Sequence, residues 1–371
     1  MDLRSHYSIM LTQAMDRSDY TFQPDLARAA TLPSRWYVDP GMLETERAAI
    51  FARTWQAVGH AEWVAEPGRY FGCDIAGEPV LVTRTANGRL RAFSNVCRHR
   101  GAELCAGRGE GAVIRCPYHA WTYTLDGALH GAPEFEGVAD WDRAEVRLPE
   151  FCAEQWGPYI FVCIDPQAPA LADVLGAIPA EIAAIGCPID RLRFACRRDY
   201  TIECNWKVYI DNYLEGYHLP AAHPSLFREL DYSQYRVETF RYYSSQIAPI
   251  RARGGAEPRR YQFTESTNDA LYYWIFPNYM LNVYPDNLSA NIILPLGPEK
   301  TLTIFEWFAY GDAGVQPATL EFSDEIQHED IRICESVQRG LRSRSYDRGR
   351  FSVKRENGVH HFHGLIAEFL E

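Results

Sequence analysis

The feature that most constrains this chain is a pair of short segments that each carry one cysteine and one histidine. The first is Cys97-Arg98-His99, and the second is Cys116-Pro117-Tyr118-His119, with sixteen residues between His99 and Cys116. Each segment follows a run of alternating apolar residues and enters a turn that contains glycine or proline. We therefore expect two tight loops that each offer one thiolate and one imidazole to a metal.

Two such loops, facing each other, could give both cysteines to one iron and both histidines to another. This is the ligand set of a Rieske [2Fe–2S] cluster, in which neutral histidines raise the reduction potential. A structural zinc ion uses the same residue types, although zinc loops more often pair like with like. Buried cysteines and ordinary histidines that meet by chance are the other alternative. The expected cluster ligands are Cys97, His99, Cys116 and His119.

A second candidate site lies near the middle of the chain. Asp211, Glu215 and His218 recur at i, i+4 and i+7, so they would share one face of a helix. His223 would lie off that face, but Pro220 cannot continue the helix, and the turn that follows would bring His223 back toward His218. Taken alone, two histidines five residues apart are more often ordinary core or surface residues.

The expected third ligand comes from a helix predicted over residues 318–341. Asp330 falls within the apolar stripe of this helix, whereas Glu329 falls on its polar side. A carboxylate that faces the core needs a cation or a metal, and an arginine is the alternative partner. Two histidines and one carboxylate on one face of an iron leave positions open for O2 and substrate.

The pattern of elements predicts an α+β chain. Short alternating runs and glycine turns over residues 55–164 indicate a small antiparallel β domain. In the second half, strands alternate with helices near 205–218, 318–341 and 355–370, which indicates an antiparallel sheet with long helices against it. The expected parts are an N-terminal arm (1–35) that packs on the second domain, a β domain (36–165) and an α+β domain (166–371).

Composition narrows the class of partner. The chain carries 37 basic and 49 acidic residues, a net charge of −12, which disfavours nucleic acid because its phosphates need a basic face. No run approaches the roughly 20 apolar residues of a membrane span, and we recognise no secretory signal. We therefore expect a cytoplasmic protein whose ten cysteines are reduced.

These motifs carry a resemblance that spans nearly the whole chain after about residue 35. The runs C-R-H-R-G-A…C-P-Y-H-A-W-T-Y, N-W-K…D-N-Y-L-E-G-Y-H-L-P-A-A-H-P and E-D…Q-R-G-L resemble those of the Rieske non-haem-iron ring-hydroxylating oxygenase α-subunits. The resemblance implies an all-β Rieske domain followed by a helix-grip (START/Bet v1-like) catalytic domain. It implies mononuclear Fe(II) held by His218, His223 and Asp330.

The resemblance also implies partners. Members are homotrimers, or hexamers with small β-subunits, and a separate flavin and iron–sulfur reductase draws electrons from NAD(P)H. The chain itself has no glycine-rich dinucleotide motif for that purpose. An acidic residue three positions before the first iron histidine, here Glu215, links one subunit's cluster to the neighbour's iron. Asp211 and Asn212 are the other expected catalytic residues.

A glutamate at position 215 is similar to the choline, carnitine and betaine branch, whereas ring dioxygenases usually have aspartate there. We therefore expect monooxygenation and N-demethylation of a small quaternary ammonium compound, in which a hydroxylated methyl group leaves as formaldehyde. The expected aromatic faces for the cation, in the strand region 272–284, are Tyr273, Phe276, Tyr279 and Tyr284.

Four other interpretations stay open at this point. The aromatic residues of that region could be sheet core, or could line a pocket for an aromatic, possibly carboxylated, substrate that the same iron hydroxylates or dihydroxylates. The chain could be a Rieske electron-transfer protein without a working mononuclear iron. It could also be a START-like ligand-binding protein with structural zinc.

Overall fold

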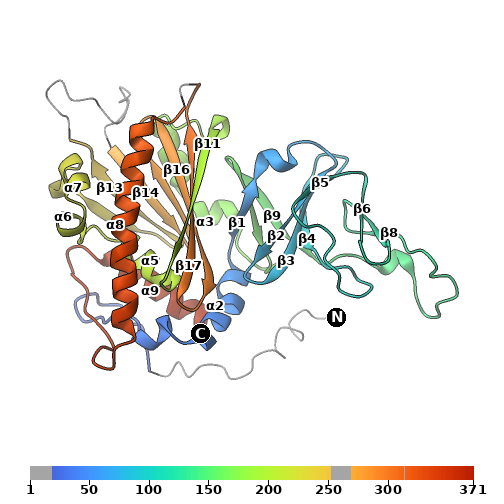
Figure 1. Cartoon of the computed structure of the whole chain (residues 1–371), viewed down its shortest axis with the longest axis horizontal. Helices are drawn as coiled ribbons and strands as arrows, with labels where there is room; N and C mark the ends of the chain where they lie inside the picture. The colour runs from blue at the N-terminus through green and yellow to red at the C-terminus, as the bar shows by residue number, and fades with distance from the viewer. Residues whose placement is uncertain (1–18, 252–268, 313) are drawn as a thin grey trace. The chain divides into compact units, whose positions relative to one another are not determined.

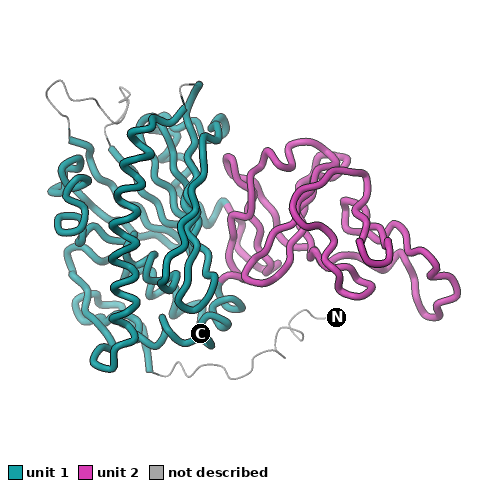
Figure 2. The backbone as a smooth tube through the Cα atoms, in the orientation of Figure 1, with its two compact units in different colours: residues 1–50, 172–371 teal, residues 51–171 magenta. Residues whose placement is uncertain are grey.

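The computed structural model describes residues 19–251, 269–312 and 314–371. The chain forms two compact units (Figure 2). Unit 2 is Phe51–Leu171, and unit 1 joins Met1–Ile50 to Ala172–Glu371. Part of the predicted N-terminal arm, residues 1–18, lies outside the described residues.

Unit 2 is built from antiparallel strands, as the alternating runs predicted. A seven-stranded sheet has the order β1-β10-β9-β4-β3-β2-β5, and a three-stranded sheet has the order β6-β7-β8. Its strands are β1 (Gln56–His60), β2 (Arg69–Ile75), β3 (Glu78–Arg84), β4 (Leu90–Ser94), β5 (Arg108–Glu110), β6 (Val113–Arg115), β7 (Thr122–Thr124), β8 (Leu129–Gly131), β9 (Glu150–Trp156) and β10 (Tyr159–Cys163). Cys97 and Cys116 belong to a buried core cluster of this unit, so the expected metal loops are anchored in packed structure.

Unit 1 contains one seven-stranded antiparallel sheet of order β11-β17-β16-β15-β14-β13-β12. Its strands are β11 (Arg193–Ile202), β12 (Arg236–Thr239), β13 (Tyr243–Pro249), β14 (Asp269–Ile275), β15 (Tyr279–Val283), β16 (Asn287–Gly297) and β17 (Lys300–Ala309). The long helix α8 (Pro317–Leu341) crosses this sheet and matches the helix predicted over 318–341 (Figure 1). The α+β class predicted for the chain is therefore confirmed.

The other helices within the described residues are mostly short. They are α2 (Pro40–Ala49), α3 (Leu171–Leu175), α4 (Ile178–Ala184), α5 (Trp206–Tyr213), α6 (Leu219–Ala222), α7 (Pro224–Glu229) and α9 (Asn357–Leu370). Single turns of 3-10 helix lie at Ser34–Tyr37, Phe51–Arg53, Ala61–Val64, Arg143–Glu145, Ile189–Arg191 and Tyr232–Gln234. Within the described part of the chain, no helix combines the length and the apolar character that a membrane crossing needs.

The predicted helix over 205–218 is shorter in the structure. Helix α5 ends at Tyr213, so Glu215 and His218 follow the helix and do not share its face with Asp211. The Glu215 carboxylate accepts hydrogen bonds from the backbone N–H groups of Tyr217 and His218, which replaces the helical pattern with a turn. Pro220 is the second residue of the short helix α6, in its first turn, whereas we had expected this proline to end a helix.

A close contact in the same turn requires glycine. A Cβ atom added to Gly216 would lie 2.6 Å from Cε1 of Tyr235, closer than packed atoms tolerate. The turn that carries Glu215 and His218 is therefore held against the Tyr235 ring.

The first predicted domain boundary is wrong by one helix. Residues 36–50 were expected in the β domain, but α2 belongs to unit 1. The physical reason is a buried ion pair, in which Lys207 Nζ lies 2.5 Å from Glu46 Oε1 and neither side chain is exposed. Trp206 Nε1 donates to the other oxygen of Glu46 at 2.7 Å. Charges that are buried so completely persist only when they are paired, so α2 is tied to α5.

Candidate metal centres and pocket

The two cysteine–histidine loops of unit 2 have the same hydrogen-bond pattern. In each loop, the cysteine N–H donates to the carbonyl five residues later, and the cysteine carbonyl accepts from the N–H four residues later. Gly101 and Ala120 occupy the equivalent fourth position, and both have a positive φ, 72° and 58°. The non-glycine residue in this left-handed conformation indicates that the loop geometry is strongly specified.

The side chains of these loops converge. Cys97 and Cys116 are each 3% exposed, and the ring centroids of His99 and His119 lie 4.6 Å apart. Among the described residues, the buried Nδ1 atom of His99 has no hydrogen-bond partner. A buried ring nitrogen without a partner is explained if it binds a metal. The four predicted side chains therefore fit a Rieske cluster, which binds through two thiolates and two imidazoles.

Neighbouring residues change the pKa values and fix the positions of the cysteine and histidine side chains in these loops. Burial, and then electrostatic interactions with the nearby His119 ring and the Arg100 guanidinium, lower the pKa of His99, which favours the neutral ring that ligates metals. Burial raises the pKa of the Cys97 thiol, so its thiolate needs a nearby cation. The Tyr123 hydroxyl lies 3.4 Å from Cys97 Sγ and can donate to that sulfur. The His99 ring also stacks on Trp121 at 4.8 Å, which fixes its plane.

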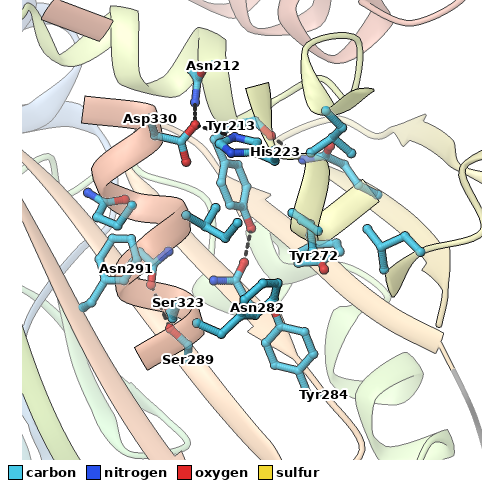
Figure 3. A pocket seen from close by; sticks show the side chains of 18 of the residues that line it. Asn212, Tyr213, His223, Tyr272, Asn282, Tyr284, Ser289, Asn291, Ser323 and Asp330 are labelled. Carbon is cyan, nitrogen blue, oxygen red and sulfur yellow. Dashed lines mark hydrogen bonds and ion pairs between the residues drawn. The ribbon is translucent and has the colours of Figure 1, made fainter. Parts of the chain in front are cut away.

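The second centre lies in unit 1, where one ligand atom from each of His218, His223 and Asp330 lies within 4.8 Å of the others. Asp330 Oδ1 is 2.9 Å from His223 Nε2 and 3.8 Å from His218 Nε2. Figure 3 shows Asp330 on α8 facing His223. The structure thus brings the three predicted side chains together, and this donor set fits a divalent iron with open positions.

In each histidine of this centre, the Nδ1 atom contacts a glutamate carboxylate. His218 Nδ1 lies 2.5 Å from Glu215 Oε1, and His223 Nδ1 lies 2.6 Å from Glu329 Oε2. Such carboxylates fix the tautomer and leave Nε2 free for a metal. Burial lowers the pKa of His223, but its bonds to Asp330 and Glu329 outweigh that effect and raise the pKa overall. The sequence pattern had placed Glu329 on the polar side of α8, so this partner was missed.

The two other predicted catalytic residues differ in position. Asn212 Nδ2 donates to Asp330 Oδ1 at 2.7 Å and lines the pocket beside the triad. Asp211 does not line that pocket. It accepts from the Tyr37 hydroxyl at 2.7 Å and lies 3.0 Å from Nε2 of the buried His363. Its contacts are therefore structural, between α5, the N-terminal segment and α9.

A pocket opens next to the triad (Figure 3). Aromatic side chains from the sheet and the helices around it form much of its wall: Tyr209, Tyr213, Tyr235, Tyr272, Tyr284, Phe305, Trp307 and Phe322. Carboxylates of Glu215 and Asp330 lie at the end that holds the triad. Within the described residues, no lysine or arginine lines this pocket.

Most of the aromatic residues predicted to line the pocket do not line it. Of the four, Tyr284 lines the pocket, whereas Tyr273, Phe276 and Tyr279 do not. Alternate residues of a strand face opposite sides of the sheet. On β14 it is Tyr272 that faces the pocket.

The pairing between strands shows which side chains face the pocket. Tyr272 pairs with Asn282 of β15, and both line the pocket. The Tyr273 side chain faces the other side, where its hydroxyl donates to Glu181 Oε2 at 2.8 Å. The alternation was visible in the sequence, but nothing in it indicated which of the two faces the pocket occupies.

Comparison with known proteins identifies the chain. Residues 189–371 match the family "Ring hydroxylating alpha subunit (catalytic domain)", and residues 54–142 match the family "Rieske [2Fe-2S] domain". The choline monooxygenase of Arabidopsis thaliana is 36% identical over 360 residues, which cover 93% of this chain and 84% of that protein. This chain belongs to the Rieske ring-hydroxylating oxygenase α-subunit family.

Other relatives point to the same branch of this oxygenase family. The carnitine monooxygenase oxygenase subunit of Escherichia coli K12 is 34% identical, covering 92% of this chain and 94% of that protein. A solved quaternary ammonium Rieske monooxygenase has a TM-score of 0.82 at 30% identity and covers 94% of this chain and 97% of that chain. A naphthalene 1,2-dioxygenase from Rhodococcus, at 20% identity and a TM-score of 0.71, shares the fold. The chain is therefore the terminal oxygenase of a Rieske monooxygenase, and the readings as an electron carrier or a zinc protein are replaced.

Proposed function

We propose that this Rieske oxygenase hydroxylates a small quaternary ammonium compound with O2. The observation that carries the proposal is the pocket beside the triad, whose wall offers aromatic faces and carboxylates, and no described lysine or arginine. A quaternary ammonium cannot donate hydrogen bonds, so ring faces and negative charge are the groups that recognise it, at roughly 0.5–2 kcal/mol per ring. The relatives named choline and carnitine monooxygenases support this substrate class.

Two sets of side chains would hold the metals. In unit 2, two thiolates and two imidazoles hold a [2Fe–2S] cluster, which supplies electrons one at a time. In unit 1, His218, His223 and Asp330 hold Fe(II), which supplies the activation of O2. The chain's own contribution is to orient these ligands, through Glu215 behind His218 and Glu329 behind His223.

Glu215 has a further proposed role. Its carboxylate holds His218 and two backbone N–H groups. In a homotrimer it would also receive a cluster histidine of the neighbouring subunit, giving an electron a hydrogen-bonded route to the catalytic site. A related quaternary ammonium monooxygenase is described in terms of inter-subunit electron transfer, which supports this assignment.

The stoichiometry of the proposed reaction determines which reactants the enzyme needs. Hydroxylation of one C–H bond consumes O2, two electrons and two protons, and yields a C–OH group and water. On an N-methyl group the product is a carbinolamine, which breaks its C–N bond to release formaldehyde. The electrons come from a separate flavin and iron–sulfur reductase that oxidises NAD(P)H.

A substrate panel tests the proposal. Choline, carnitine, glycine betaine and simple arenes are each supplied to the holoenzyme with a surrogate reductase, and product formation is measured together with NADH and O2 consumption. We expect an oxygenated product or formaldehyde from at least one quaternary ammonium compound, and none in Asp330→Ala. A hydroxylated arene, with no product from any quaternary ammonium compound, would overturn the substrate class in favour of an aromatic one.

A further inference from the structure

The sheet face beneath the pocket carries a row of polar side chains between the aromatic ones. Strand pairing sets Tyr272 opposite Asn282, Asn282 opposite Ser289, and Ser289 opposite Trp307. Directly opposed residues share one face of a sheet, and all four line the pocket. Asn291, two residues after Ser289 on β16, lies on the same face.

The hydrogen bonds of this row use the acceptors of both asparagines. The Tyr213 hydroxyl donates to Asn282 Oδ1 at 2.8 Å, and the Ser289 hydroxyl donates to Asn291 Oδ1 at 2.9 Å. Over the residues that the structure describes, neither Nδ2 group of these asparagines donates to a protein acceptor. Each carboxamide is thus oriented by its oxygen, and its two N–H donors are left for something else.

In the other side-chain amides that line the pocket, the NH2 group already donates to a protein acceptor. Gln246 Nε2 donates to the Tyr213 carbonyl at 2.7 Å, and Gln327 Nε2 donates to Thr303 Oγ1 at 3.2 Å. Asn212 donates to Asp330. Figure 3 shows the oxygens of Asn282 and Asn291 joined to Tyr213 and Ser289, with the two amide nitrogens on the sides of the carboxamides that face each other.

We propose that Asn282 and Asn291 form a donor pair that binds an oxygen acceptor on the substrate, at the end of the pocket remote from the triad. This inference rests on the proposed function and adds a second feature to its substrate class. The substrate is a quaternary ammonium compound whose tail carries a carboxylate, carbonyl or hydroxyl oxygen. A site with buried donors discriminates against a ligand that lacks the acceptor, because the donors would then be desolvated without a partner.

Replacing each asparagine by aspartate tests the pair. Asn282→Asp and Asn291→Asp keep the side-chain size and the accepting oxygen, but they change the N–H donors into an oxygen. The holoenzyme is titrated calorimetrically with glycine betaine, choline and tetramethylammonium, which carry a carboxylate, a hydroxyl and no oxygen, respectively. Asn87→Asp, in an exposed turn of unit 2, makes the same chemical change away from the pocket and controls for net charge.

We expect each pocket variant to weaken the binding of glycine betaine at least tenfold and that of choline less, because a hydroxyl can also donate. Tetramethylammonium binding is not weakened, and Asn87→Asp binds all three like the parent. Unchanged betaine affinity, or an equal loss for all three ligands, would overturn the donor pair, since an equal loss indicates a structural role.

Ligand binding by the parent protein distinguishes a failure of the donor pair from a failure of the proposed function. If it binds betaine no better than tetramethylammonium, the donor pair is refuted and the proposed function stands. If neither these three ligands nor carnitine bind, the proposed function fails, and the donor pair fails with it.

Discussion

The Nδ1 atom of His223 lies 2.6 Å from Oε2 of Glu329, and this contact fixes the direction in which the imidazole presents its other nitrogen. A comparable bond from Glu215 holds His218. Each histidine of the triad therefore depends on a carboxylate that does not itself ligate a metal.

Glu329→Gln is expected to lower the iron affinity of the triad. The neutral amide makes a weaker bond to His223 Nδ1 and supports the required tautomer less well, and losses of about 10–100-fold are typical of such partners. Competition with a chelator measures the affinity. Glu321→Gln, on the exposed side of the same helix, is the matched control, and an affinity equal to the control would refute the role of Glu329.

Tyr123→Phe is expected to lower the reduction potential of the cluster. The Tyr123 hydroxyl lies 3.4 Å from Cys97 Sγ, and a hydrogen bond to a ligand sulfur favours the reduced cluster. A bond of about 1 kcal/mol corresponds to roughly 40 mV for one electron. Spectroelectrochemical titration measures the shift. The iron content should stay at the parent value, and an unchanged potential would contradict the assignment.

Lys207→Met is expected to destabilise unit 1 strongly. The substitution leaves Glu46 as an unpaired charge at a site with no exposure, which costs about 3–5 kcal/mol in comparable cases. The double variant Glu46→Gln/Lys207→Met removes both charges and should recover part of that loss in a denaturation experiment. As a control, Lys300→Met breaks the exposed pair with Glu203 and should change the free energy of unfolding by no more than about 1 kcal/mol. Equal effects of Lys207→Met and Lys300→Met would argue against the tie between α2 and α5.

The stability of the chain should fall below neutral pH because of His361. Burial lowers the pKa of this histidine to about 4, whereas the unfolded value is about 6.5. Between these values the unfolded chain binds a proton that the folded chain does not, so stability is complete above pH about 6.5 and decreases as the pH falls.

The expected loss from this residue at pH 5 is on the order of 2 kcal/mol. Denaturation midpoints of the parent and of His361→Leu, measured at several pH values between 7 and 5, test the effect. The parent should lose more stability than the variant over this range. Parallel curves for the two proteins would show that His361 does not cause the dependence.

The sequence allowed much of the site to be predicted, for identifiable reasons. Cys97 and His99 could be assigned because these two closely spaced ligands occupy one short loop, where local geometry dominates, and the same holds for Cys116 and His119. Asp330 could be assigned because a carboxylate in an apolar stripe needs a partner. The structure brings it to His218 and His223 as that argument requires.

The parts that could not be predicted depend on tertiary contacts. Glu329 lies on the polar side of an ideal helix, and only the approach of His223 to α8 gives it a buried role. The early end of α5 depends on the Glu215 carboxylate, which binds backbone N–H groups that a continued helix would use. Tyr272 was missed since a strand pattern defines two faces but does not say which one covers the pocket.

A comparison of the parent with Asp330→Ala shows whether this chain holds two iron sites of different kinds. Iron analysis, the visible spectrum and product formation are measured on the same preparations of parent and variant. We expect about three irons per chain in the parent and about two in the variant, with the cluster spectrum retained and hydroxylation lost. A variant that keeps the full iron content and turns over like the parent would show that Asp330 does not hold a catalytic iron.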